Sequence, residues 1–178
     1  PASEPLSIET DVILRIADLG AGMLSMLELI LVGGGQDDDR KKQSMLALIN
    51  KHIKSSGQKN DNSCTVTKLE YFAYESNLNL LQGCKERLHL MGFKEVQDMT
   101  TSHDGRVTFI RAASDASSND VEVLLHLYSR DFQAQQRTPH DLDLIIGCCF
   151  ADLFEPNQLA LSLQRFARGG VIGHPPLI

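Results

Sequence analysis

Short apolar runs that predict strands alternate with longer segments that predict helices along most of this chain. The runs lie at residues 12–17, 65–74, 107–112, 121–128 and 142–148. Helices are predicted between and after them, at residues 23–32, 45–53, 77–91 and 156–167. The first of these segments is apolar nearly all round, which predicts a buried helix. A last strand is predicted to begin at Val171. Strands that alternate with helices predict an α/β fold with a mostly parallel sheet.

The first strand leads into a glycine-containing turn. Asp18 follows the apolar run, and glycines stand at positions 20 and 22. Glycine has no Cβ, so the chain can turn sharply there and a ligand can approach the backbone closely. We therefore expect a ligand against Gly20 and Gly22.

Other polar side chains follow the later strands. In open α/β sheets, ligands bind beyond the carboxyl ends of the strands, which here carry Asp18, Glu75, Asp131 and Cys148. A carboxylate at Glu75 would accept hydrogen bonds from both hydroxyls of a ribose. Asp131 would accept from an exocyclic amine, and Phe132 would offer its ring to a purine. Each residue alone also fits an ordinary turn or surface position, but their order along the chain favours a nucleotide-like ligand.

The glycine spacing distinguishes between classes of nucleotide site. A dinucleotide fingerprint requires G-x-G-x-x-G, and Ser25 stands at its third glycine position. The phosphate-binding loop G-x-x-x-x-G-K-[S/T] does not occur in the sequence. The pattern D-x-G-x-G at positions 18–22 instead resembles motif I of the class I S-adenosylmethionine-dependent methyltransferases.

This resemblance extends from Val12 to Ile172. "LEYFAYE" is similar to the second motif, whose acid binds the cofactor ribose and matches Glu75. "SRDF" is similar to the third motif, whose acid lies near the adenine and matches Asp131, beside Phe132. The segment after the fourth strand, which the family places beside the methionine part and the substrate, matches Gly147 and Cys148, with Phe150 and Asp152 beyond them.

The resemblance implies a Rossmann-like, mostly parallel sheet with helices on both faces. It also implies an S-adenosylmethionine site that includes Asp18, Gly20, Ala21 and Gly22. Methyl transfer is an in-line displacement that depends mainly on positioning donor and acceptor, so the catalytic residue need not be of one type and none is assigned. His140 is a candidate general base, and a surface histidine before a strand is the alternative.

The chain departs from the family pattern in several places. The acid after the second strand usually follows the glycines by about 20 residues. Glu75 lies much further along, so residues 33–63 fit an insertion. A hairpin before Asp131 fits a second insertion and leaves Asp115 as a rival for the adenine-side acid. We expect residues 1–178 to form a single methyltransferase-like domain that is incomplete at both ends, with the remainder of a longer chain completing it.

Composition limits the partners. The net charge of the 178 residues is −6 and no block is rich in Lys or Arg, which argues against nucleic acid and favours a small-molecule substrate. No apolar run approaches the roughly 20 residues that span a bilayer, so no membrane segment is expected. The four cysteines show neither zinc spacing nor a disulfide pattern, which predicts reduced thiols, a cytoplasmic location and no metal site.

The same pattern of strands and glycines is compatible with two other functions. A non-catalytic interaction domain could keep the sheet and lose the cofactor pocket. A dinucleotide-dependent oxidoreductase of the NAD type could use the same strand–turn–helix unit.

Overall fold

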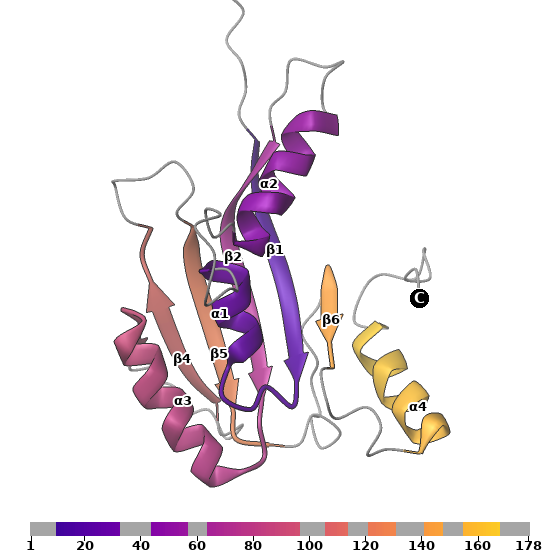
Figure 1. Ribbon diagram of the computed structural model, residues 1–178. Coiled ribbons are helices and arrows are strands. Elements are labelled where there is room, and N and C mark those ends of the chain that lie inside the picture. Colours follow the sequence, from indigo (N-terminus) through magenta and orange to yellow (C-terminus); the bar gives the residue numbers. More distant parts are fainter. Residues whose placement is uncertain are drawn as a thin grey trace, which may run out of the picture.

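A computed structural model describes residues 10–32, 44–56, 64–96, 106–113, 121–130, 141–147 and 155–167. Within these residues the chain forms a six-stranded sheet and flanking helices (Figure 1). The elements in chain order are β1 (Thr10–Leu19), α1 (Ser25–Leu31), α2 (Met45–Ser56), β2 (Cys64–Tyr74), α3 (Leu78–Leu90), β3 (Lys94–Val96), β4 (Arg106–Arg111), β5 (Glu122–Tyr128), β6 (Leu144–Ile146) and α4 (Pro156–Ala167).

The sheet is mixed and mostly parallel, with the strand order β3-β4-β5-β2-β1-β6. β1 runs parallel to β2 and β6, and β5 runs parallel to β2. The hairpin strands β3 and β4 are antiparallel to each other, and β4 is antiparallel to β5. The α/β fold class predicted from the alternation of strands and helices is therefore confirmed. The carboxyl ends of β1, β2, β5 and β6 lie along one side of the sheet, which we call its carboxyl edge.

The predicted hairpin is correct in its pairing but not in its place in the sheet. β4 and β5 are antiparallel neighbours, as expected. However, β5 also pairs along its whole length with β2, so it is a central parallel strand. The strands added beside the parallel part of the sheet are β4 and β3, and the sequence pattern did not predict β3. β5 takes the central place because its carboxyl-terminal half is buried on both faces, as in interior parallel strands.

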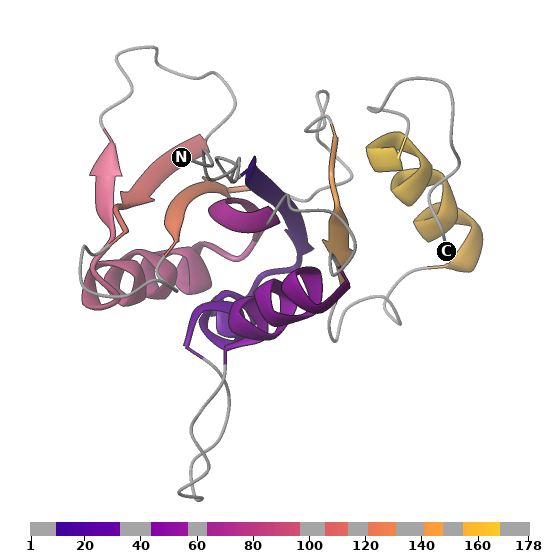
Figure 2. The same ribbon diagram turned by 90° about the horizontal axis from the view of Figure 1, so that it is seen from above.

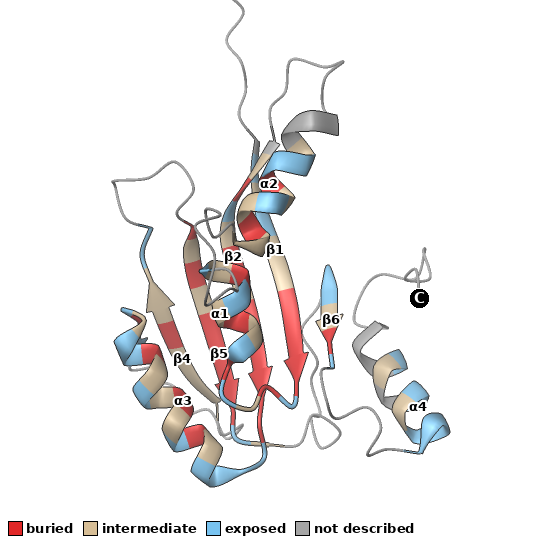
Figure 3. Ribbon diagram, in the orientation of Figure 1, coloured by how far each residue is buried: buried red, intermediate tan, exposed pale blue. Residues whose placement is uncertain are grey.

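One face of the sheet carries the main core. Figure 2 shows α1, α2 and α3 together on this side of the sheet. Leu24, Leu27 and Ile30 around α1 and Leu81 and Leu88 on α3 are buried there against the strands. Figure 3 shows that buried residues concentrate in the carboxyl-terminal halves of β1 and β2, at the edge where the parallel strands end.

The other face carries a smaller cluster built on stacked aromatic rings. The rings of Tyr74 and Tyr128 stack with centroids 4.7 Å apart and an interplanar angle of 7°. Leu159 and Leu163 of α4 pack against this cluster, so this face also receives a helix. Apolar residues on both faces of the strands are typical of a sheet that is covered on both sides.

The predicted helices agree with the observed ones, with one correction. α4 occupies the predicted residues 156–167, and α3 begins after Asn77 as expected. The segment at residues 23–32 was predicted to be a helix buried all round. Met23, Leu29 and Val32 are instead exposed, because α1 lies on the surface of the sheet and only one side of it faces the strands.

Candidate functional site

The glycine turn, residues 20–24, connects β1 to α1 at the carboxyl edge of the sheet. Gly20 and Gly22 have φ angles of 74° and 53°, in the left-handed region that favours glycine. The backbone N–H groups of Gly20 and Ala21 donate to the carbonyl oxygen of Tyr74 at 3.0 and 2.9 Å. The turn predicted from the sequence is therefore present and is tied to the end of β2.

Glu75 links the glycine turn to the start of α3. Its side chain is buried, with the residue 8% exposed. Its Oε2 accepts from the Gly22 N–H at 2.9 Å, and its Oε1 accepts from the Asn77 N–H at 2.7 Å. Its own N–H donates to the carbonyl oxygen of Tyr128 at 3.1 Å. Its carboxylate therefore connects the turn after β1 to the start of α3, and its backbone N–H connects the end of β2 to the end of β5.

Asp18 lies beneath the turn and inside β1, one residue before the strand ends. It is 1% exposed, and its Oδ2 accepts from the Tyr71 hydroxyl at 2.5 Å. Burial raises the pKa of Asp18, and the charge of Glu75 raises it further, while the hydrogen bond from Tyr71 opposes this rise. The buried carboxyl groups of Asp18 and Glu75 are thus close enough for the charge of Glu75 to raise the pKa of Asp18.

Leu24 closes the turn in a strained conformation. It has a φ of 60°, which is uncommon for a residue with a Cβ, and its side chain is fully buried. Its N–H donates to the carbonyl oxygen of Ala21 at 2.9 Å. Leu24 is also the N-cap residue of α1 and provides no side-chain hydrogen bond there. Residues 20–24 thus contain three left-handed positions.

The end of β6 borders the turn on its other side. Ile146 pairs with Asp18 across the β1–β6 ladder, so Gly147 follows at the same edge of the sheet. Gly147 is exposed. Gly147, which was matched to the segment after the fourth strand, thus follows the strand that lies next to β1.

The other predicted site residues lie outside the described residues. These are the adenine-side acid Asp131 and its rival Asp115, the neighbouring Phe132, the methionine-side Cys148, and also Phe150, Asp152 and His140. The strand predicted to begin at Val171 lies outside them as well. The structure thus brings together Asp18, Gly20, Ala21, Gly22 and Glu75.

Three residues around the turn were not singled out from the sequence. The hydroxyl of Tyr71 donates to Asp18, while Cys84 and Arg87 of α3 donate to carbonyl oxygens of the turn. Tyr71 carried a usable signal. It alternates with Leu69 and Ala73 in a buried strand, and a buried tyrosine hydroxyl usually has a hydrogen-bond partner.

A second polar cluster lies across the face of the sheet that is opposite the main core. His126 Nδ1 lies 3.3 Å from the Thr108 hydroxyl, and its Nε2 lies 3.4 Å from Glu70 Oε1. Glu70 Oε2 accepts from Arg15 Nε at 3.0 Å. Because each member stands on a different strand, from β4 to β1, the cluster links four strands side by side.

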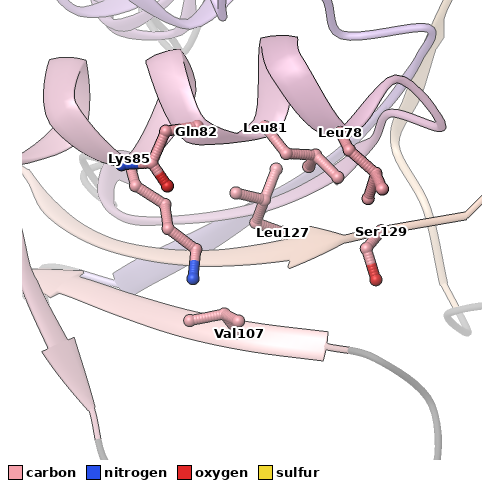
Figure 4. Close-up of a pocket in the computed structure, with 7 residues that line it drawn as sticks. All are labelled: Leu78, Leu81, Gln82, Lys85, Val107, Leu127 and Ser129. Atoms are coloured by element: carbon pink, nitrogen blue, oxygen red, sulfur yellow. The ribbon is translucent and has the colours of Figure 1, made fainter.

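A small cavity lies on the side of α3 that faces β4 and β5 (Figure 4). It encloses about 240 Å³ and is lined by Leu78, Leu81, Gln82, Lys85, Val107, Leu127 and Ser129. None of the residues of the glycine turn lines it, and neither does Glu75. Because its volume is below the usual range of roughly 300–1,000 Å³ for ligand sites, we place the candidate site at the glycine turn instead.

Among the residues that the structure describes, no group of three His, Cys, Asp or Glu side chains could hold a metal ion. Within the same residues no helix has the length and apolar character needed to cross a membrane.

Comparison of the chain with protein-family models, with curated proteins and with solved structures found no match.

Proposed function

We propose that this domain binds S-adenosylmethionine at the glycine turn and transfers its methyl group to a small molecule. The observation that carries the proposal is the contact between Glu75 and Gly22. It joins the acid after β2 to the glycine turn after β1, which are the positions matched to the second and first motifs of the class I methyltransferases.

The strand order supports a site at this place. The four parallel strands lie in the order β5-β2-β1-β6, which is third, second, first and fourth along the chain. This is the order in one part of the Rossmann type of sheet, where ligands bind at the point at which the order reverses. That point lies between β1 and β6, beside Asp18 and Gly147.

The charge of the site favours this cofactor over a dinucleotide. S-adenosylmethionine carries a positive sulfonium centre and an ammonium group. Asp18 and Glu75 beneath the turn create a negative potential that would attract these groups and repel a pyrophosphate.

The geometry of the site also fits the cofactor. Each oxygen of Glu75 accepts one backbone hydrogen bond, and a carboxylate oxygen has the capacity for a second one, from a ribose hydroxyl. Gly20 is exposed, so a ligand can approach its backbone. When bound, S-adenosylmethionine supplies an electrophilic methyl group.

The residues of this chain would then act by binding and orientation. Glu75 would hold the ribose, and residues 20–22 would lie against the methionine part. By their order along the chain, Asp131 and Phe132 would face the adenine and Cys148 the methionine part. Asp131 is preferred to Asp115 because β5 ends at the edge that carries Glu75, whereas β4 runs in the opposite direction.

The proposal also includes the class of substrate and the cellular location of the protein. Its acidic net charge favours a small-molecule substrate over nucleic acid, and reduced cysteines favour a cytoplasmic location. The alternative is a non-catalytic domain with the same sheet, which would not bind the cofactor.

Titration calorimetry with S-adenosylhomocysteine tests the proposal. We expect binding to the wild-type protein and at least roughly tenfold weaker binding for Glu75→Gln, because a hydrogen-bond acceptor of the ribose is lost. Gly20→Val should also weaken binding, because valine disfavours the φ of 74° and its side chain blocks close approach. Glu86→Gln, at an exposed position on α3, is the matched control.

Folding is measured for each variant through its thermal unfolding without ligand. An absence of binding heat and of a ligand-induced thermal shift in folded wild-type protein would contradict the proposal. Displacement of the ligand by NAD would favour the oxidoreductase alternative instead.

A further inference from the structure

α3 contacts the glycine turn through residues on one side of the helix. The Cys84 thiol donates to the carbonyl oxygen of Gly22, with Sγ 2.8 Å away. Arg87 Nη1 donates to the carbonyl oxygen of Met23 at 3.1 Å. The other terminal nitrogen of Arg87, Nη2, forms an ion pair with Glu28 in the first turn of α1. α3 therefore contacts both the turn and the helix that follows it.

Gly83 also faces the glycine turn. A Cβ built at Gly83 would lie 2.7 Å from Cε and 2.9 Å from Sδ of Met23. Because such distances are shorter than a van der Waals contact, Met23 would have to move if position 83 carried a larger side chain. Gly83, Cys84 and Arg87 thus share one surface, which packs against residues 22–28.

The turn needs support from outside itself. Gly22 and Leu24 both have positive φ, and leucine rarely adopts this conformation unless its surroundings hold it there. The hydrogen bonds from α3 reach the two carbonyl groups that directly precede Leu24, those of Gly22 and Met23. These contacts are therefore in the right place to stabilise the strained segment.

We propose that Cys84 and Arg87 are positioning residues that hold the glycine turn in its left-handed conformation and thereby set its affinity for the cofactor. The affinity part of this inference rests on the proposed function, whereas the conformational part does not. Neither residue needs to touch the ligand.

The thiol of Cys84 has the protonation state that this role requires. It is fully buried, and burial raises its pKa to about 11, with a smaller contribution from Glu75. It therefore keeps its proton and remains a hydrogen-bond donor at neutral pH. A serine in its place would keep a donor, and an alanine would not.

Amide hydrogen exchange measured by NMR on the ligand-free protein tests the conformational part. We expect exchange at Gly22 and Leu24 to be roughly tenfold faster in Cys84→Ala and Arg87→Met than in the wild type, since each loses a hydrogen bond to the turn. Cys84→Ser should restore slower exchange. Lys85→Met, which removes a charge from another side of the same helix, is the matched control.

The buried amide of Leu125 in β5 separates this role from a general loss of stability. Unchanged exchange at Gly22 and Leu24, or an equal increase at Leu125, would overturn the inference. Binding of S-adenosylhomocysteine is then measured for the same variants, and we expect Arg87→Met to bind more weakly than Lys85→Met. Equal affinities, or no binding to the wild type, would overturn the affinity part, and the exchange rates would still decide the conformational part.

Discussion

At the residue scale, the buried carboxyl group of Asp18 makes stability depend on pH. Its carboxyl group is buried beneath the glycine turn, with the Tyr71 hydroxyl as its hydrogen-bond donor and Glu75 nearby. Burial disfavours the charged form, so the folded protein binds this proton more tightly than the unfolded chain does. A carboxylate in this position is unfavourable for folding and favourable for a cationic ligand.

Asp18→Asn should change how stability depends on pH. The pKa of Asp18 is raised above its ordinary value of 3.8, so the unfolded chain loses this proton first as the pH increases. The free energy of unfolding of the wild type should therefore fall relative to Asp18→Asn above about pH 4, by at most about 1.4 kcal/mol per pH unit.

Urea unfolding of both proteins between pH 4 and pH 8 measures this difference. Asp11→Asn, at an exposed position on the same strand, is the control for removing a negative charge. If the free energy of unfolding of wild type and of Asp18→Asn changed with pH in the same way, Asp18 would not be the group that makes stability fall above about pH 4.

At the scale of elements, α3 is the helix whose start the sequence marks most clearly. Asn77 is its N-cap, and its side-chain oxygen accepts from the backbone N–H groups of Asn79 and Leu80 at 3.0 and 3.4 Å. The backbone N–H of Asn77 donates separately to Glu75. A substitution at position 77 can therefore remove the side-chain cap of α3 and leave the backbone contact with Glu75 in place.

Asn77→Ala should lower the free energy of unfolding by about 1 kcal/mol, since the first turn of α3 loses its side-chain acceptor. Asn77→Ser should recover most of this loss because serine also caps helices well. Chemical denaturation compares the three proteins. S-adenosylhomocysteine affinity should change much less than in Glu75→Gln, because the backbone contact with Glu75 remains; a loss as large as that of Glu75→Gln would contradict this separation of roles.

At the scale of the whole molecule, the sheet has a stable centre and weaker edges. β1 and β2 pair with each other over their full lengths, and both have a second neighbour. β6 pairs with β1 over three residues and β3 pairs with β4 over three, at the two edges of the sheet. The strands that end beneath the glycine turn are thus the best supported.

Native-state hydrogen exchange should reflect this arrangement. We expect the slowest exchange in the buried positions of β1, β2 and β5, since opening them requires the sheet to unfold globally. The amides of β3 and β6 should exchange faster through local opening. Protection of amides in β6 equal to that in β2 would show that β6 is stabilised by more than its three residue pairs with β1.

Much of the fold and the centre of the site could be predicted from sequence patterns alone. Period-two and helical patterns located the paired strands and the helices, because these patterns report which side of a local segment is buried. Asp18, the two glycines and Glu75 were predicted to share one site because parallel strands place their carboxyl ends together. β3 was missed because three exposed residues carry no such pattern.

The sequence by itself determined the type and order of the described elements other than β3, and the polar groups that end the strands. Tertiary structure alone decided that β5 joins β2, that Tyr71 donates to Asp18, and that Glu75 holds Gly22. It also decided that α3 contacts the turn through Cys84 and Arg87. The physical reason is that local burial leaves a periodic trace in the sequence, whereas a contact between distant residues depends on how whole elements pack.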